Sequence, residues 1–267
     1  MRHLAALLFV GVTALLGAAC NGSTGSEIVT FEAYARGPDG ARGPGYTFQT
    51  GRGYTVQLDR MRLRIGGLYL NRSLPVSGGQ ERSCFLPGVY VAEVPSELLV
   101  DVLDERPQKF PGLGRGTRDR GIAGEVWLTG ARIDAPTDAS IILDVAGRAT
   151  RGGSTLPFEG QLTISANRRP QVIDATRPGA DPLCSKRIVT PISVDVTPED
   201  GGALTVRVDP KGMFSNVEFS ELTPPEAAGR PYRFADTDIG QPNVALFAGM
   251  RAAAGVYQFE FNASAVP

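Results

Sequence analysis

From Glu27 onward, apolar and polar residues alternate with a period close to two. Such alternation is typical of β-strands that bury one face, and Gly, Pro, Asp and Asn interrupt it at short intervals, as turn residues do. The pattern predicts strands over Ile28–Ala35, Tyr54–Leu58, Met61–Leu70, Val89–Val94, Leu98–Leu103, Ile122–Ile133, Ser140–Ala149, Phe158–Ser165, Ile188–Val196, Ala203–Val208, Asn216–Phe219 and Val256–Phe261.

Strands that follow one another without intervening helices predict an all-β fold, either an antiparallel β-sandwich or a barrel-like sheet. Few or no long helices are expected, since Val244–Ala254 is the only segment suited to one. Asp200-Gly201-Gly202 is a typical turn sequence and predicts a hairpin between the strands on either side of it. A Pro-rich segment near 167–185 leaves open a division into two packed β-subdomains.

The amino-acid composition supports a folded, strand-rich chain. The 267 residues include 33 Gly and 20 Pro, which disfavours a helical bundle. The 27 basic and 28 acidic residues nearly cancel, giving a formal net charge of −1. Nothing in this balance indicates a nucleic-acid partner.

The first residues have the pattern of an export signal. Arg2 and His3 provide a positive start, and an uncharged apolar run follows over Leu4–Gly17. As a helix, this run of about 14 residues spans roughly 21 Å, which is shorter than the roughly 30 Å hydrocarbon core of a bilayer. The sequence therefore predicts a cleaved signal peptide rather than a permanent membrane span.

The end of this run, Leu16-Gly17-Ala18-Ala19-Cys20, resembles the lipobox of bacterial lipoproteins. The resemblance implies that the Cys20 thiol receives a diacylglyceryl group and that cleavage follows Ala19, which would tie a β-rich envelope protein to a membrane. Ordinary secretion is the alternative, because Gly17 and Ala19 also fit the cleavage site of a released protein.

The count of three cysteines favours lipidation over release. An exported chain with three cysteines has one left over, and a free thiol is a liability in an oxidising compartment. Lipidation of Cys20 uses the odd cysteine and leaves Cys84 and Cys184 as a predicted disulfide pair. The expected organisation is a signal peptide over 1–19, a flexible tether over 20–27, a β-rich domain over 28–262 and a C-terminal tail over 263–267.

Few familiar catalytic groups remain once the signal peptide is removed. The only histidine is His3, so the mature chain would lack the Ser-His-Asp group, the Cys-His group and histidine-ligated metal sites. No catalytic residue, metal site or cofactor is predicted. A hydrolase working through two carboxylates on envelope glycans stays open as the alternative to a protein without enzymatic activity.

The strand around residue 62 carries the clearest candidate for binding. Arg60, Arg62 and Arg64 alternate with apolar residues, so an extended strand places three guanidinium groups on one face. They form either a solvated face paired with acids of a neighbouring strand or a site for anionic envelope components. Alternation also places Trp127 on one face with Glu125 and Thr129, for which packing is favoured over a sugar platform.

Together these features predict a lipid-anchored protein of the bacterial cell envelope with a binding or structural role, and with no nucleic-acid partner. Its expected partners are the membrane, reached through the lipid, and an anionic envelope component or another protein. The outer membrane or the periplasmic face is the expected location, and the extracellular surface stays open.

Overall fold

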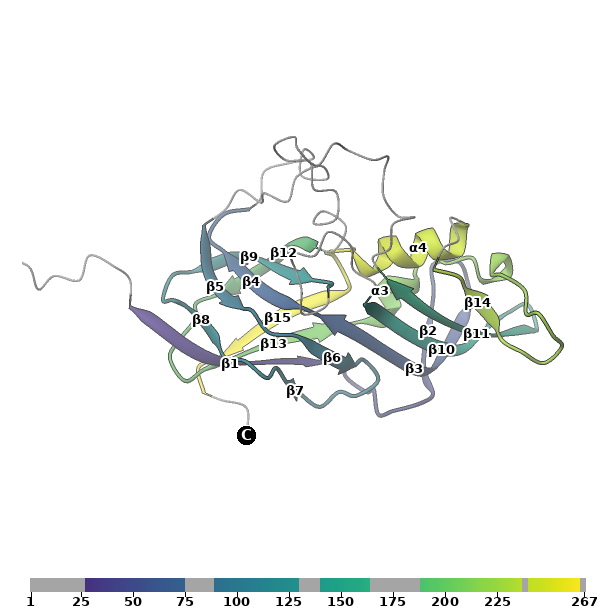
Figure 1. Cartoon of the computed structure of the whole chain (residues 1–267), viewed down its shortest axis with the longest axis horizontal. Helices are drawn as coiled ribbons and strands as arrows, with labels where there is room; N and C mark the ends of the chain where they lie inside the picture. Colours follow the sequence, from purple (N-terminus) through teal and green to yellow (C-terminus); the bar gives the residue numbers. More distant parts are fainter. Residues whose placement is uncertain (1–26, 75–88, 130–139, 164–187, 237–239, 265–267) are drawn as a thin grey trace, which may run out of the picture.

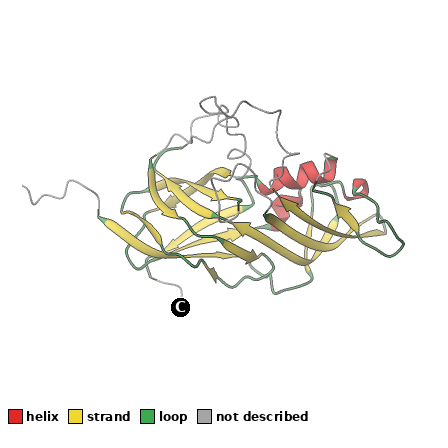
Figure 2. Cartoon of the chain, viewed as in Figure 1, coloured by secondary structure: helices red, strands yellow, loops and turns green. Residues whose placement is uncertain are grey.

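The computed structural model describes residues 27–74, 89–129, 140–163, 188–236 and 240–264. Over these residues the chain is mostly strand, with short helices near its C-terminal end (Figures 1 and 2). The predicted all-β fold is confirmed. In the described part of the chain, no helix is long and apolar enough to span a bilayer.

The strands form two sheets that lie one after the other along the long axis of the molecule (Figure 1). The first sheet runs in the order β12 (Ile188–Val196), β9 (Gly121–Trp127), β4 (Gly67–Asn71), β5 (Tyr90–Val94), β8 (Gly114–Thr117), β1 (Ile28–Arg36), β13 (Ala203–Val208) and β15 (Tyr257–Asn262), with β7 (Gln108–Lys109) also pairing with β1. Its two ends, β12 and β15, contact each other, so this sheet is nearly closed and barrel-like.

The second sheet is open. It runs in the order β14 (Tyr232–Phe234), β11 (Ser154–Thr163), β10 (Ile141–Arg151), β3 (Thr55–Ile65) and β2 (Tyr46–Gln49), and β6 (Leu98–Asp101) also pairs with β3. Most pairings in both sheets are antiparallel, but β1 with β13 and β11 with β14 are parallel, so both sheets are mixed.

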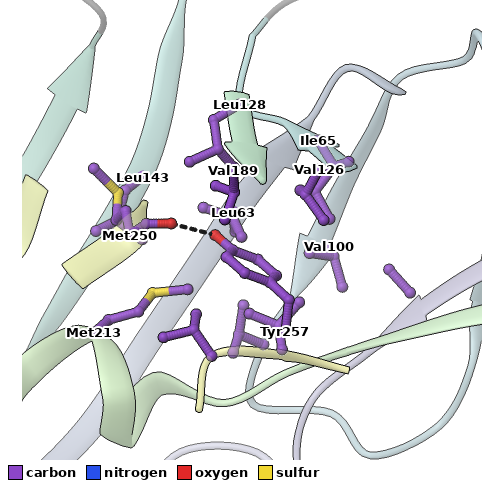
Figure 3. Close-up of a cluster of buried hydrophobic side chains, with 14 of the residues drawn as sticks. Leu63, Ile65, Val100, Val126, Leu128, Leu143, Val189, Met213, Met250 and Tyr257 are labelled. Atoms are coloured by element: carbon purple, nitrogen blue, oxygen red, sulfur yellow. Dashed lines mark hydrogen bonds between the residues drawn. The ribbon is translucent and has the colours of Figure 1, made fainter. Parts of the chain in front are cut away.

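Both sheets share one hydrophobic core. Leu63 and Leu143 of the second sheet lie in the same buried cluster as Val126 of the first sheet and Leu128, which follows β9 (Figure 3). The phenol of Tyr257, also buried there, donates a 2.7 Å hydrogen bond to the Met250 carbonyl oxygen, and burial raises its pKa. This shared core fixes the orientation of one sheet relative to the other.

Three short helices cover the inner face of the second sheet (Figure 2). They are α3 (Pro210–Phe214), the 3-10 helix η3 (Phe219–Glu221) and α4 (Gln241–Met250). Asp209 caps α3 by accepting a 2.9 Å hydrogen bond from the Lys211 amide, and Pro210 suits the first helical position. The segment predicted as a helix over Val244–Ala254 overlaps α4.

The predicted hairpin at Asp200-Gly201-Gly202 is wrong. β12 pairs with β9, while β13 pairs with β1 and β15. The turn is held by β1 instead, because the Asp200 carboxylate accepts hydrogen bonds of 2.9 and 3.0 Å from the Thr30 amide and hydroxyl. A good turn sequence therefore formed a turn, but contacts distant in sequence decided which strands pair.

Three further differences separate the predicted strands from the observed ones. Asn216–Phe219 is not a strand and leads into η3. The predicted break after Leu58 is absent, since β3 runs through to Ile65, and the chain changes sheets at Gly66 instead. The short strands β2, β7, β8 and β14 had no predicted counterpart.

Candidate functional site

The three arginines of β3 lie on one face of the strand, as their alternation predicts. Arg60 and Arg62 are exposed and Arg64 is partly exposed. The intervening apolar side chains, Met61, Leu63 and Ile65, are fully buried in the shared core. β3 is therefore amphipathic, and its arginine face is the outer face of the second sheet.

Two of these arginines are paired with carboxylates. Arg60 donates hydrogen bonds of 2.9 and 3.1 Å to the two oxygens of Asp144 on the neighbouring β10. Arg64 donates to Glu97 and, at 3.1 Å, to the Ile141 carbonyl oxygen. The outer face thus carries both charge signs rather than a bare positive patch.

Arg62 lies between two acidic positions in the sheet. In the backbone register of the sheet, Arg62 is opposite Asp144 of β10 on one side and Asp101 of β6 on the other. Its side chain is exposed, and within the described residues it forms no ion pair. Of the three predicted anion-binding residues, Arg62 is the one whose guanidinium is most available to a ligand.

A groove with a cavity volume of about 530 Å³ lies on the same outer face. Its walls come from β3, β10, β11 and β14 together with the residues that follow β14. This volume is within the range of small-molecule sites, roughly 300–1,000 Å³. The charged and amide side chains that line it are Arg60, Asp144, Glu159, Gln161, Arg233 and Asp236.

The parallel pairing of β11 with β14 builds one wall of this groove. Glu159 and Arg233 are opposite each other in that pairing, and Gly160 is opposite Phe234. A Cβ atom on Gly160 would lie 2.5 Å from the Cβ of Phe234, so a larger residue would push the strands apart. The absence of a side chain at Gly160 lets β14 lie close against β11.

Asp236 fixes the end of the same wall. Its carboxylate accepts a 2.9 Å hydrogen bond from the Thr163 amide and another from the Thr163 hydroxyl, at the end of β11. The segment that carries Arg233 is therefore attached to β11 twice, by the β14 pairing and by the contact of Asp236 with Thr163. Such anchoring holds a binding wall in place before a ligand arrives.

Several groove side chains already have a partner: Arg60 pairs with Asp144, Asp236 with Thr163, and Arg233 donates to Glu226 at 3.5 Å. Guanidinium groups and carboxylates each have more than one hydrogen-bonding position, so these residues can still bind a ligand.

The groove residues offer complementary hydrogen-bonding groups. Arg60 and Arg233 donate and suit carboxylate or phosphate oxygens, whereas Asp144, Glu159 and Asp236 accept from hydroxyl or amino groups. Gln161 can do both. This donor and acceptor set matches a polar ligand rich in hydroxyl groups that also carries acidic groups.

A second polar cluster lies on the first sheet around Glu125, which is completely buried. Trp127 Nε1 donates a 3.0 Å hydrogen bond to its carboxyl, and Asn71 Nδ2 donates at 2.5 Å. The Tyr90 hydroxyl is 3.4 Å from both carboxyl oxygens. Burial raises the pKa of Glu125, although the three donors act to lower it.

In the described part of the chain, this cluster contains one buried polar atom without a partner. The buried Asn71 Oδ1 atom has no hydrogen-bond partner among the described residues, and a buried unpaired acceptor costs about 1–3 kcal/mol. The Trp127 ring lies 5.1 Å from that of Tyr69, so this tryptophan packs within the cluster. The cluster does not line the groove.

The remaining predicted site residues lie outside the described residues. These are the lipid-attachment residue Cys20 and the predicted disulfide pair Cys84 and Cys184. Across the described ranges, no group of three or more His, Cys, Asp or Glu side chains is placed to hold a metal ion.

Comparison with protein-family models, with curated proteins and with solved structures finds no match to this chain.

Proposed function

We propose that this protein is a lipid-anchored binding protein of the bacterial cell envelope and that its ligand is a glycan carrying acidic groups. The observation that carries the proposal is the groove on the outer face of the second sheet, whose side chains offer both guanidinium donors and carboxylate acceptors. The lipobox-like sequence ending at Cys20 supports the anchor.

The location of Glu125, a carboxyl group with a raised pKa, favours binding over hydrolysis. A carboxylate-based glycosidase needs a general acid with a raised pKa beside a second carboxylate at the ligand. Burial raises the pKa of Glu125, but Glu125 is on β9 and does not line the groove. The hydrolase alternative depends on Asp144, Glu159 and Asp236, and it predicts release of sugar that Glu159→Gln abolishes.

The groove is tested by reversing one charge that lines it and one that does not. Arg233 lines the groove, whereas the exposed Arg230 does not. With a fluorescent, lipid-free polysaccharide prepared from lipopolysaccharide as the probe, Arg233→Glu should weaken binding by about 10- to 100-fold, because a charged hydrogen bond contributes about 1.5–3 kcal/mol. Arg230→Glu should leave the dissociation constant nearly unchanged.

Two results would count against the groove. The first is equal loss of affinity in Arg233→Glu and Arg230→Glu, which would indicate only a general charge effect. The second is loss of binding in the double variant Arg62→Glu, Arg64→Glu while Arg233→Glu binds normally, which would move the ligand to the arginine face of β3. The binding titration of each variant is run at low and at physiological salt, since exposed charges are screened as salt rises.

A further inference from the structure

Exposed apolar side chains gather at the end of the first sheet where the described chain begins. Ile28 is 76% exposed, Leu74 and Val89 are each 55% exposed, and Tyr90 is 44% exposed. They are four of the eight large exposed hydrophobic residues in the described part of the chain. We call these four residues the tether-end patch.

Strand pairing explains why residues so distant in sequence meet there. Tyr90 is opposite Asn71 in the pairing of β5 with β4. The amide of Arg72, which follows Asn71, donates a 2.9 Å hydrogen bond to the Val89 carbonyl oxygen. Leu74 follows two residues later at the same sheet end. Ile28 and Tyr90 also line one shallow recess of about 260 Å³ between β1, β5 and β8.

Single exposed apolar residues are ordinary on protein surfaces, but a cluster of them marks an interaction site. The remaining four, Leu99, Leu113, Ile141 and Val244, lie on other elements. The tether-end patch is therefore the place on the described surface where an apolar partner is best accommodated.

The position of the patch identifies its partner. Eight peptide units separate Cys20 from Ile28, and a chain of that length extends at most about 29 Å. A lipid on Cys20 would therefore keep Ile28 close to the bilayer surface, and a short tether gives a weak contact a high effective concentration. Tyrosine with aliphatic neighbours is also a composition found at membrane interfaces.

We propose that the tether-end patch rests on the bilayer in which the Cys20 lipid is inserted. This inference rests on the lipid anchor of the proposed function. The groove lies at the opposite end of the molecule from the patch, because it is formed by strands of the second sheet (Figure 1). The patch would hold the domain upright and present the groove away from the membrane.

Apolar contact, rather than attraction to anionic lipid, is the expected basis of this docking. Arg72 contacts Asp119 at 2.5 Å, and Arg118 contacts Glu27 at 3.4 Å, so basic residues at this end are matched by acids. Orientation should therefore persist at high salt and in vesicles of neutral lipid.

Two valines with nearly equal exposure provide a matched test. Val89 in the patch is 55% exposed, and Val244 on α4 is 54% exposed. The full-length lipidated chain is reconstituted into phosphatidylcholine vesicles whose acyl chains carry bromine, which quenches tryptophan fluorescence on contact. After subtraction of the Trp127 signal, Val89→Trp should be quenched at least about twofold more than Val244→Trp, because only the former lies at the interface.

Equal quenching of Val89→Trp and Val244→Trp overturns the proposed orientation. Ile28→Trp provides a second patch position if Val89→Trp does not fold, and it should behave as Val89→Trp does. Intact mass of the same samples separates the two proposals. If the chain is acylated but the patch is not quenched, only the proposed orientation is contradicted. If the chain carries no acyl group, the proposed anchor and the proposed orientation are both contradicted.

Discussion

Replacing Phe158 with alanine should lower the free energy of unfolding by about 3–5 kcal/mol, the usual loss when a buried phenylalanine is removed. Phe158 on β11 is 1% exposed. Its ring centroid lies 5.0 Å from that of Phe219, 5.7 Å from that of Phe234 and 6.1 Å from that of Phe214. The substitution removes a ring of the second sheet that packs against both α3 and η3.

The size of this effect depends on how little the cluster can collapse. The four rings come from β11, β14, α3 and η3, and each is held by its own backbone element, so a cavity would persist. Urea unfolding followed by circular dichroism measures the change. Leu99→Ala, at a position that is 43% exposed, is the control and should cost less than about 1 kcal/mol. A comparable loss in the two variants would contradict the described core.

Glu218 should also be sensitive to substitution, because its carboxylate joins three segments of the chain. It accepts hydrogen bonds from the Tyr54 hydroxyl and, at 2.6 Å, from the Ser220 hydroxyl. Arg151, at the end of β10, donates two more, at 2.7 and 3.1 Å. The Glu218 side chain is 13% exposed, and the Arg151 guanidinium also stacks 4.1 Å above the Tyr54 ring.

These contacts determine how stability depends on pH. Burial raises the pKa of Glu218, but the hydrogen bonds from Ser220, Tyr54 and Arg151, with the positive charge of Arg151, outweigh it and lower the pKa to about 2. The pKa is lower in the folded state than in the unfolded chain, whose ordinary value is about 4.5. The stabilisation is therefore complete above about pH 4.5 and is lost as the pH falls toward about 2.

Glu218→Gln should lower the free energy of unfolding at pH 7 by about 2 kcal/mol and flatten its fall between pH 4.5 and 2. Glu221→Gln, at an exposed residue of η3, should change neither quantity appreciably. Urea titrations at a series of pH values test both statements. An unchanged acid dependence in Glu218→Gln would show that another carboxylate carries it.

The fold could be predicted where each strand carries its own signal. Alternation located β1, β12 and β13 closely, because one buried face requires an apolar residue at every second position. It missed β14, which is short and obtains its place from pairing with β11 rather than from its own sequence. Pairing order failed at Asp200 for the same reason, since Thr30, far away in sequence, holds that turn.

The candidate site was predictable in part for a related reason. Alternation placed Arg60, Arg62 and Arg64 on one face, but it could not show that Asp144 and Glu97 would neutralise two of them. Asp144 is brought next to β3 by the pairing of β10, and Glu97 lies in the loop between β5 and β6. The groove has no sequence motif, because its polar residues come from four strands and the segment after β14, and each of them looks like an ordinary exposed residue.

Lipid anchoring is tested by the intact mass of the protein expressed from its full-length sequence and purified from membranes of a bacterial host. We expect a mature chain that begins at Cys20 and carries a diacylglyceryl group, and we expect Cys20→Ser to abolish both the added mass and the membrane fractionation. A chain of unmodified mass, or a Cys20→Ser variant that still fractionates with membranes, would contradict it.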